Sequence, residues 1–192
     1  MLDIFYWIGG TILLIAWIEF LLFFKDIIHT GKVKAYKAKA SEKESFWIMI
    51  VVYIICLGIM AGEFWKYTPE AMSYAGYAGI ALIFIGGMLR VLARQELDRF
   101  FTFQVIIQEG HKLITRGPFK YIRHPTYLGN ILIMLGLSLA LQTTFGIIVV
   151  IVFFIPAVIY RISAEEKLFY DEFGKEYLDY MEKTKKLIPY LY

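Results

Sequence analysis

An arginine and two carboxylates lie within one helical turn at the end of a long apolar run. Arg161 and Glu165 are four residues apart, so on a helix they share one face, and Glu166 follows directly. In water such a pair would be an ordinary surface salt bridge, worth roughly 0.3–0.5 kcal/mol. Beside an apolar run, ionisable groups are costly and tend to line a cavity. We therefore predict a binding site here, in which the planar guanidinium of Arg161 suits a carboxylate.

A second group of candidates precedes another apolar run. Pro125 is suited to the first position of a helix, where its missing N–H costs nothing. His124 then lies beside a helix N-terminus, whose free N–H groups attract anions. The alternative is an interfacial anchor, with Arg123, His124 and Tyr127 at the level of the lipid headgroups. Both interpretations stay open from these residues alone.

An aromatic stripe follows the carboxylates, with polar residues between its members. Its spacing is that of an amphipathic helix. Such a stripe is more typical of packing or interfacial anchoring than of cofactor stacking, so we predict one of these two roles. The stripe comprises Phe169, Tyr170, Phe173, Tyr177 and Tyr180.

The sequence lacks the residues that several kinds of chemistry require. The three histidines are scattered and no His-Glu-x-x-His occurs, so we predict no metal site. The single cysteine, Cys56, excludes a disulfide within the chain. No dinucleotide or P-loop glycine motif is present, and no Gly-x-Ser-x-Gly. The net charge of +3 gives no signal for nucleic acid.

The elements that position these groups must be apolar helices. The chain has 192 residues and is 59% hydrophobic, against roughly 45–50% apolar residues in soluble domains. We predict one all-α domain over residues 1–192, integral to the membrane, with five transmembrane helices of about 20 residues or fewer. The last two, joined by the polar residues 142–144, are expected to form a short helical hairpin. The predicted spans are residues 4–24, 46–64, 71–93, 126–142 and 145–160.

Basic residues predict the orientation of these spans. They concentrate in the first loop, between the third and fourth spans, and after the fifth, whereas Lys66 stands on the opposite side. The positive-inside rule then places the N-terminus outside and the C-terminus in the cytoplasm. The segments 94–123 and 161–192 would emerge side by side at the cytoplasmic face. We predict a site shared between them, within residues 94–180.

An ordered set of motifs resembles the isoprenylcysteine carboxyl methyltransferase family. The resemblance covers roughly residues 94–180. The His-Pro-x-Tyr piece alone is also similar to phospholipid N-methyltransferases and to the C-terminal part of sterol reductases. The motifs are Gly110-His111 with Leu113, then Gly117-Pro118, then Arg123-His124-Pro125-x-Tyr127-x-Gly129, then Arg161, Glu165-Glu166 and Phe173-Gly174-x-Glu176-Tyr177-x-x-Tyr180.

The resemblance implies a cofactor, a substrate and residue roles. The cofactor would be S-adenosylmethionine, and the substrate the C-terminal carboxylate of a prenylated cysteine, held by Arg161. Phe119 departs from the family, where this position is often tyrosine, so a hydroxyl contact is lost. The cofactor-binding positions carried over are Gln104, His111, Lys112, Leu113, Ile114, Phe119, His124, Pro125, Thr126, Tyr127 and Glu165.

The residue types agree with these implied roles. Lys112, His124 and the N–H groups opening the fourth span suit the cofactor carboxylate. Glu165 suits its ammonium group or ribose diol, and the rings of Tyr127 and Phe119 suit the adenine or the sulfonium. A carboxylate is already a nucleophile, so the enzyme mainly has to hold two reactants in line.

Other functions remain open at this point. A lipophilic substrate would enter between helices, and we expect it to meet the cofactor between the hairpin and the third span. A phospholipid N-methyltransferase is an alternative, although Arg161 would repel an amine. An NADPH-dependent reductase and a non-catalytic membrane scaffold are more distant alternatives. The physiological substrate and the oligomeric state are not predicted.

Overall fold

The computed structural model describes residues 40–67, 69, 71–100 and 110–189. This part of the chain is helical, with one isolated parallel bridge between Ile122 and Lys185. The first predicted span, residues 4–24, lies outside the described residues, as does Gln104. The helices are α2 (Ala40–Lys66), α3 (Tyr74–Leu97), α4 (Pro125–Ala140), α5 (Thr144–Val149), α6 (Ile155–Phe173) and α7 (Lys175–Lys183). Shorter turns are the 3-10 segments Asp98–Phe100 and Gly117–Lys120 and the π-helical turn Val150–Phe154.

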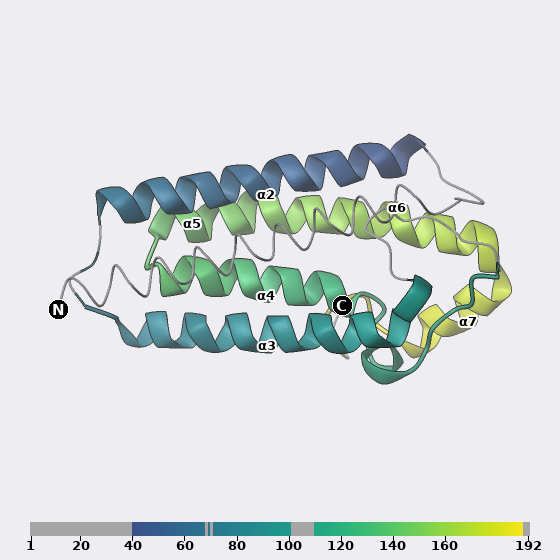
Figure 1. Cartoon of the computed structure of the whole chain (residues 1–192). Coiled ribbons are helices and arrows are strands. Elements are labelled where there is room, and N and C mark those ends of the chain that lie inside the picture. The colour runs from purple at the N-terminus through teal and green to yellow at the C-terminus, as the bar shows by residue number, and fades with distance from the viewer. Residues whose placement is uncertain (1–39, 68, 70, 101–109, 190–192) are drawn as a thin grey trace.

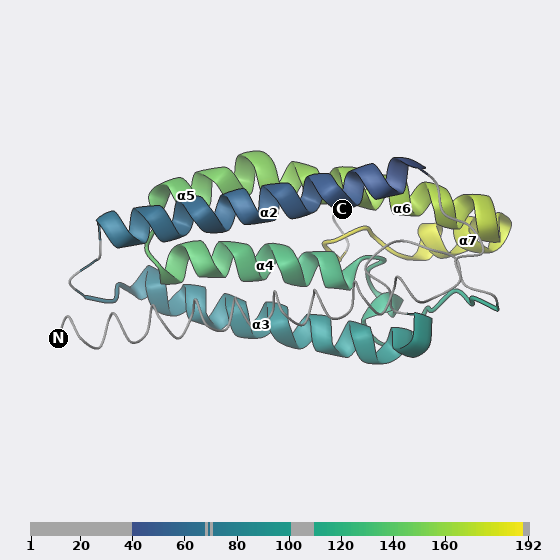
Figure 2. The same ribbon diagram turned by 45° about the horizontal axis from the view of Figure 1, so that its top comes forward.

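The long helices form a bundle with all its loops at two ends (Figure 1). α3 packs along α4, and α2 packs on the rod made by α5 and α6. In the turned view of Figure 2, α2 lies between this rod and α4. The start of α2, the end of α3, the start of α4 and the end of α6 meet at one end of the bundle, where α7 lies. The predicted shared site falls at this end.

Three of the described helices are long and apolar enough to cross a membrane. They are Glu44–Lys66, Tyr74–Leu97 and Thr144–Phe173. The first contains the predicted span 46–64, and the second overlaps most of the predicted span 71–93. Pro125–Ala140 is shorter, and 16 residues rise only about 24 Å, less than the roughly 30 Å of a hydrocarbon core. The expected short arm of the hairpin is therefore confirmed for α4.

The helix that contains the last predicted span, residues 145–160, continues beyond that span. The apolar pattern stops at residue 160, but the helix continues to Phe173 because the following charged residues are good helix formers. It ends at Gly174, whose φ of +53° suits glycine. The hairpin thus has one short and one long arm, and the long arm carries Arg161 and Glu165 beyond the apolar part.

A proline is accommodated within the long arm by a π-helical turn. Pro156 has no N–H to donate, which would leave a carbonyl of the previous turn unpaired. The chain widens over Val150–Phe154, and the N–H of Ile155 donates to the carbonyl of Val150. Such turns are a known way to insert a proline without ending a helix. α5 and α6 therefore act as one rod.

Glycines let α3 and α4 pack with their backbones in contact. A Cβ on Gly79 would lie 2.5 Å from the Gly136 carbonyl oxygen, and one on Gly86 would lie 2.6 Å from that of Gly129. The two pairs are seven residues apart on each helix, which keeps them on one face. Gly79 and Gly86 therefore let α3 approach the backbone of α4 closely.

Gly86→Ala is expected to destabilise the bundle by about 1–3 kcal/mol, because its methyl group would push the α4 backbone away. Gly87→Ala is the matched control, since a Cβ there meets nothing within 4 Å. Alanine at that position should leave stability unchanged or raise it by up to about 1 kcal/mol. Thermal unfolding of the detergent-purified variants measures both. Equal melting temperatures would contradict the close packing.

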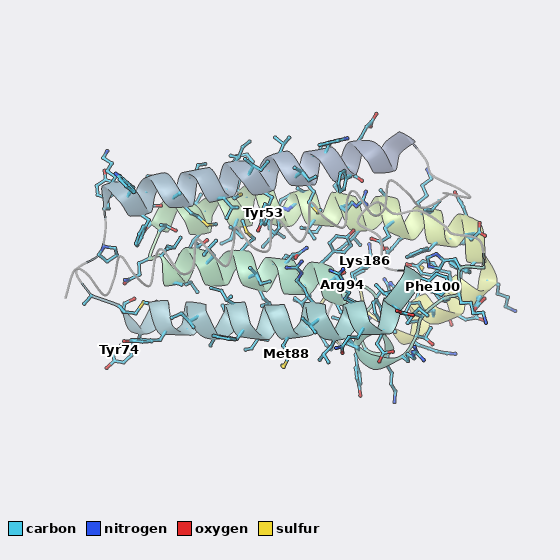
Figure 3. All side chains as sticks on the ribbon, viewed as in Figure 1. Tyr53, Tyr74, Met88, Arg94, Phe100 and Lys186 are labelled. Carbon is cyan, nitrogen blue, oxygen red and sulfur yellow. The ribbon has the colours of Figure 1, made fainter. Side chains whose placement is uncertain are left out.

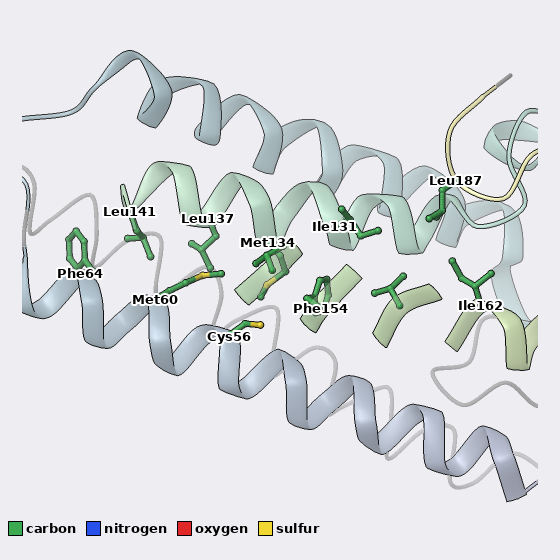
Figure 4. Close-up of a cluster of buried hydrophobic side chains, with 12 residues drawn as sticks. Cys56, Met60, Phe64, Ile131, Met134, Leu137, Leu141, Phe154, Ile162 and Leu187 are labelled. Carbon is green, nitrogen blue, oxygen red and sulfur yellow. The ribbon is translucent and has the colours of Figure 1, made fainter. Parts of the chain in front are cut away.

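One apolar core joins the second span to the hairpin (Figure 4). Outward side chains on α3, such as Tyr74 and Met88, point away from the bundle (Figure 3). They are 96% and 61% exposed, as expected for a surface solvated by lipid. The core comprises Cys56, Met60 and Phe64 of α2, Ile131, Met134, Leu137 and Leu141, Val150 and Phe154, Val158 and Ile162, and Leu187 from the C-terminal segment.

Candidate active site

The loop that enters the site is attached to the end of α3. Arg116 Nε contacts Glu96 Oε2 at 2.6 Å. Gly117 has φ +58°, and a Cβ there would meet the Glu96 side chain at 2.7 Å. Glycine therefore allows both the backbone turn and the close approach of Glu96. These contacts hold residues 110–116 at the end of the bundle where α7 lies.

The start of α4 is as the sequence predicts. Pro125 is the first helical residue and His124 is the N-cap, with no capping hydrogen bond from its side chain. The backbone N–H of His124 donates to the carbonyl of Lys186, and that of Arg123 to the carbonyl of Lys185. The C-terminal segment therefore returns to the beginning of α4. Nothing in the local sequence pattern indicated this pairing.

A buried charge cluster lies behind the start of α4. Glu166 Oε1 accepts from Arg123 Nε at 2.8 Å and lies 3.3 Å from His124 Nε2, while Glu166 Oε2 lies 3.2 Å from Lys186 Nζ. Arg123 Nη1 also donates to the carbonyls of Met181 and Thr184. Arg123 and His124 are only 9% and 3% exposed. The headgroup-anchor interpretation of these two residues is therefore wrong.

A cleft that is partly open to solvent lies in front of this cluster. Most of the described residues predicted to bind a cofactor line it, so the structure brings together segments before α4 and after the hairpin. Pro125, Tyr127 and Arg161 are not among its lining residues. The predicted residues that line the cleft are His111, Lys112, Leu113, Ile114, Phe119, His124, Thr126 and Glu165. The additional ones are Leu97, Arg123, Phe169, Phe173, Tyr177 and Tyr180.

Four of the five residues of the aromatic stripe, Phe169, Phe173, Tyr177 and Tyr180, line the cleft and also pack on one another. α6 ends at Gly174 and the chain turns, so that α7 brings Tyr177 and Tyr180 to the side already occupied by Phe169 and Phe173. Tyr180 is fixed by donating its hydroxyl to the Phe119 carbonyl at 2.7 Å. The stripe's periodicity predicted one face, but what that face meets depends on the turn at Gly174.

The ring of His111 lies among aromatic rings. It stacks on Phe100 with centroids 4.7 Å apart and meets the edges of Phe169 and Phe173 at 6.0 Å. Burial lowers the pKa of His111 below its usual value, with an opposing effect from the Glu172 carboxylate. The imidazole is therefore neutral at pH 7, with one nitrogen able to accept a hydrogen bond.

Three buried polar atoms around the cleft have no hydrogen-bond partner in the described part of the chain. They are His111 Nδ1, Glu165 Oε2 and the Tyr177 hydroxyl oxygen. Burial raises the pKa of Tyr177 well above its usual range, so that hydroxyl remains a donor. Buried polar groups in folded proteins are normally paired. A ligand with both donors and acceptors would satisfy these three.

Arg161 is buried beside the cleft rather than in its wall. It is 0% exposed, and its Nη1 donates to Ser45 Oγ at 2.8 Å. Its Nε donates to the Tyr127 hydroxyl at 3.2 Å, and that hydroxyl also bonds the Glu165 carboxylate. The guanidinium lies 5.8 Å from the centre of the Phe46 ring. Arg161 thus faces the second span, not the third. The expected meeting point of substrate and cofactor between the hairpin and the third span stays a prediction.

Comparison with known proteins identifies the region that carries this site. The model of the isoprenylcysteine carboxyl methyltransferase family matches residues 79–171, just under half of the chain. Residues 79–171 are therefore similar to this family. The matched region includes the cleft residues from Leu97 to Phe169 and Arg161. Tyr177 and Tyr180, and also Ser45 and Phe46, lie outside the match.

Individual relatives support the same family. A probable protein-S-isoprenylcysteine O-methyltransferase of Oryza sativa subsp. indica is 30% identical over 127 residues, covering 64% of this chain and 66% of the relative. Protein-S-isoprenylcysteine O-methyltransferase B of Arabidopsis thaliana is 30% identical over 115 residues, covering 59% and 58%. The chain therefore spans no more than about two thirds of these curated relatives.

A solved structure shows that the fold is shared. The eukaryotic intramembrane Ras methyltransferase of the isoprenylcysteine carboxyl methyltransferase family aligns with a TM-score of 0.64 at 24% identity, over 72% of this chain and 52% of that one. The all-α membrane fold predicted from the sequence is thereby confirmed. The positions of the cofactor and substrate residues stay predictions.

Proposed function

We propose that this protein is a membrane methyltransferase that uses S-adenosylmethionine to methylate the carboxylate of a prenylated cysteine or a similar lipophilic acid. The observation that carries this proposal is the arrangement of Arg161 and Glu165. One turn of α6 holds a fully buried guanidinium and a carboxylate whose Oε2 is unpaired beside the cleft. The relatives' names supply the reaction type, and these residues supply a place for an acid next to a place for a cationic cofactor.

The groups that line the cleft suit S-adenosylmethionine. The unpaired Glu165 Oε2 suits the ammonium group or the ribose hydroxyls. Lys112 and the N-terminus of α4 suit the carboxylate. The aromatic walls, including Phe169 and Phe173, suit the adenine and the sulfonium.

The chain's own residues have little chemistry to perform beyond positioning. When bound, S-adenosylmethionine would supply a methyl group already activated on a sulfonium. Arg161 would hold the acceptor carboxylate so that one oxygen approaches that methyl group in line. A carboxylate with a pKa near 3.5 is ionised at neutral pH, so no side chain has to remove a proton.

The orientation of the site follows from the bundle. We propose that the end carrying α7 faces the cytoplasm, with the C-terminus there and the N-terminus outside. Lys112, Arg116, Lys120 and the basic residues of 167–186 belong to this end, and Lys66 belongs to the other. A water-soluble cofactor would then enter from the cytosol, and a lipidated acceptor from the bilayer. A fluorescent reporter fused after Tyr192 should be protected from external protease; external cleavage would contradict this orientation.

Methyl transfer in detergent or liposomes tests the proposed reaction. Labelled S-adenosylmethionine should transfer its methyl group to an N-acylated prenylcysteine with a free carboxylate, but not to its carboxamide. Transfer to phosphatidylethanolamine instead would establish the N-methyltransferase alternative. Binding of NADPH with no binding of S-adenosylmethionine would favour the reductase. Binding of neither would leave the scaffold interpretation.

Glu165→Gln is expected to weaken cofactor binding about tenfold to a hundredfold. The neutral amide keeps the shape of the side chain but loses charge-assisted hydrogen bonds, each worth roughly 1.5–3 kcal/mol. Titration calorimetry with S-adenosylmethionine measures the effect. Glu176→Gln is the control, because it removes a carboxylate from an exposed position on α7 that does not line the cleft. Equal affinities for both variants and the wild type would contradict the role of Glu165.

A further inference from the structure

The start of α2 contacts the proposed acceptor arginine, although it lies well outside the matched family region of residues 79–171. Ser45 is 0% exposed and accepts a hydrogen bond from Arg161 Nη1 at 2.8 Å. Phe46, 1% exposed, places its ring 5.8 Å from the guanidinium carbon. Two consecutive residues near the start of α2 therefore contact one side chain of α6.

Both contacts select one orientation of the guanidinium. A long arginine side chain has many rotamers, and fixing it costs conformational entropy that its partners must offset. The Ser45 oxygen and the Tyr127 oxygen accept from two different nitrogens of Arg161, and these two bonds define the plane of the group. The aromatic face of Phe46 adds a cation–π contact. The three partners come from two other helices, α2 and α4, so the orientation depends on how these helices pack on α6.

We propose that Ser45 and Phe46 are positioning residues that set the orientation of Arg161 for the acceptor carboxylate, which makes α2 the acceptor-side wall of the site. The cofactor side, by contrast, is built from the residues around α4, α6 and α7. Tyr127 connects the two sides, because its hydroxyl accepts from Arg161 and bonds the Glu165 carboxylate. This inference rests on the proposed function, in that the acceptor is taken to be a carboxylate.

Substitutions in α2 should therefore affect acceptor binding, whereas substitutions of the cofactor residues should affect cofactor binding. Arg161 keeps its charge when Ser45 is changed, so the site remains attractive to an acid. Loss of one hydrogen bond to a charged group corresponds to about a tenfold change or more in an equilibrium constant. That change should appear in acceptor binding and not in cofactor binding, because neither Ser45 nor Phe46 lines the cleft.

Ser45→Ala tests the proposal through the separation of two affinities. We expect the acceptor KM to rise about tenfold while the S-adenosylmethionine dissociation constant stays within about twofold of the wild type. Ser45→Thr, which keeps a hydroxyl, should recover much of the loss, and Phe46→Leu should again raise the acceptor KM alone. Ser138→Ala is the matched control, since Ser138 is also 0% exposed but its hydroxyl contacts the Met134 carbonyl and Met60 Sδ rather than Arg161.

A direct measurement of acceptor binding makes the test independent of catalytic turnover. The affinity of each variant for a prenylcysteine analogue with a free carboxylate is compared with its affinity for the carboxamide. A selective loss of carboxylate affinity in Ser45→Ala supports the proposal even if the wild type transfers no methyl group, in which case only the proposed function fails. Unchanged carboxylate affinity in Ser45→Ala, or an equal loss in Ser138→Ala, overturns the positioning role.

Discussion

Arg161→Lys is expected to lower kcat/KM for the carboxylate acceptor by at least about a hundredfold while leaving cofactor affinity within about threefold. Arginine presents several N–H groups in a plane, and two of its nitrogens are already committed to Ser45 and Tyr127. A lysine ammonium is a point charge that cannot reproduce this fork. Each charge-assisted hydrogen bond is worth roughly 1.5–3 kcal/mol, so the loss of two such bonds corresponds to a fall in kcat/KM of about a hundredfold or more.

The measurement is steady-state methyl transfer combined with cofactor calorimetry on the same preparations. Arg116→Lys serves as the matched control, because the Arg116 side chain is 72% exposed and pairs with Glu96 at the rim. Thermal unfolding shows whether the Arg161 variant is folded. Wild-type acceptor kinetics in Arg161→Lys would exclude Arg161 as the carboxylate ligand. An equal loss of cofactor affinity would place Arg161 in the cofactor site instead.

The second large effect concerns stability rather than chemistry. Glu166→Ala is expected to lower the free energy of unfolding by about 3–5 kcal/mol, because it leaves a buried guanidinium without its carboxylate. Glu166 is 8% exposed and contacts Arg123, His124 and Lys186. These contacts hold together the end of α6, the start of α4 and the C-terminal segment. Denaturant unfolding in mild detergent measures the change.

Two further variants test whether the loss of stability comes from breaking a buried ion pair or from removing a charge in general. Arg116→Ala removes an exposed partner and should cost less than about 1 kcal/mol. The double replacement Arg123→Met with Glu166→Leu should recover part of the loss, since no unpaired buried charge remains. A Glu166→Ala protein as stable as Arg116→Ala would show that the cluster does not hold the site together.

Local sequence patterns predicted much of the bundle. The apolar runs placed α2 and α3, the polar residues 142–144 placed the turn of the hairpin, and Pro125 placed the first residue of α4. These features depend on the composition of a continuous stretch, so they can be read without knowing its neighbours. The end of α6 could not be read this way, because the apolar pattern ends at residue 160 whereas the helix ends at Gly174.

The candidate site likewise has features that the sequence predicts and features that depend on tertiary packing. Most of its cofactor residues follow from motifs close together in sequence, and the structure gathers them around one cleft. Glu165 and Glu166 look equivalent in the sequence, yet a rotation of about 100° per residue turns the first toward Tyr127 and the second toward Arg123. Which carboxylate serves the cleft and which serves the fold is decided by what packs on each face of α6.

The sequence by itself determined the helical membrane architecture and the set of chemical groups at one end. Only the tertiary structure decided their partners: Ser45 reaches Arg161 across 116 residues, and Thr184 reaches Arg123 across 61. Apolar periodicity specifies that a helix forms and which of its faces is buried. It does not specify which helix covers that face, because neighbours distant in the chain are chosen by packing, here by the glycine contacts of α3 with α4 and by the core that joins α2 to the hairpin.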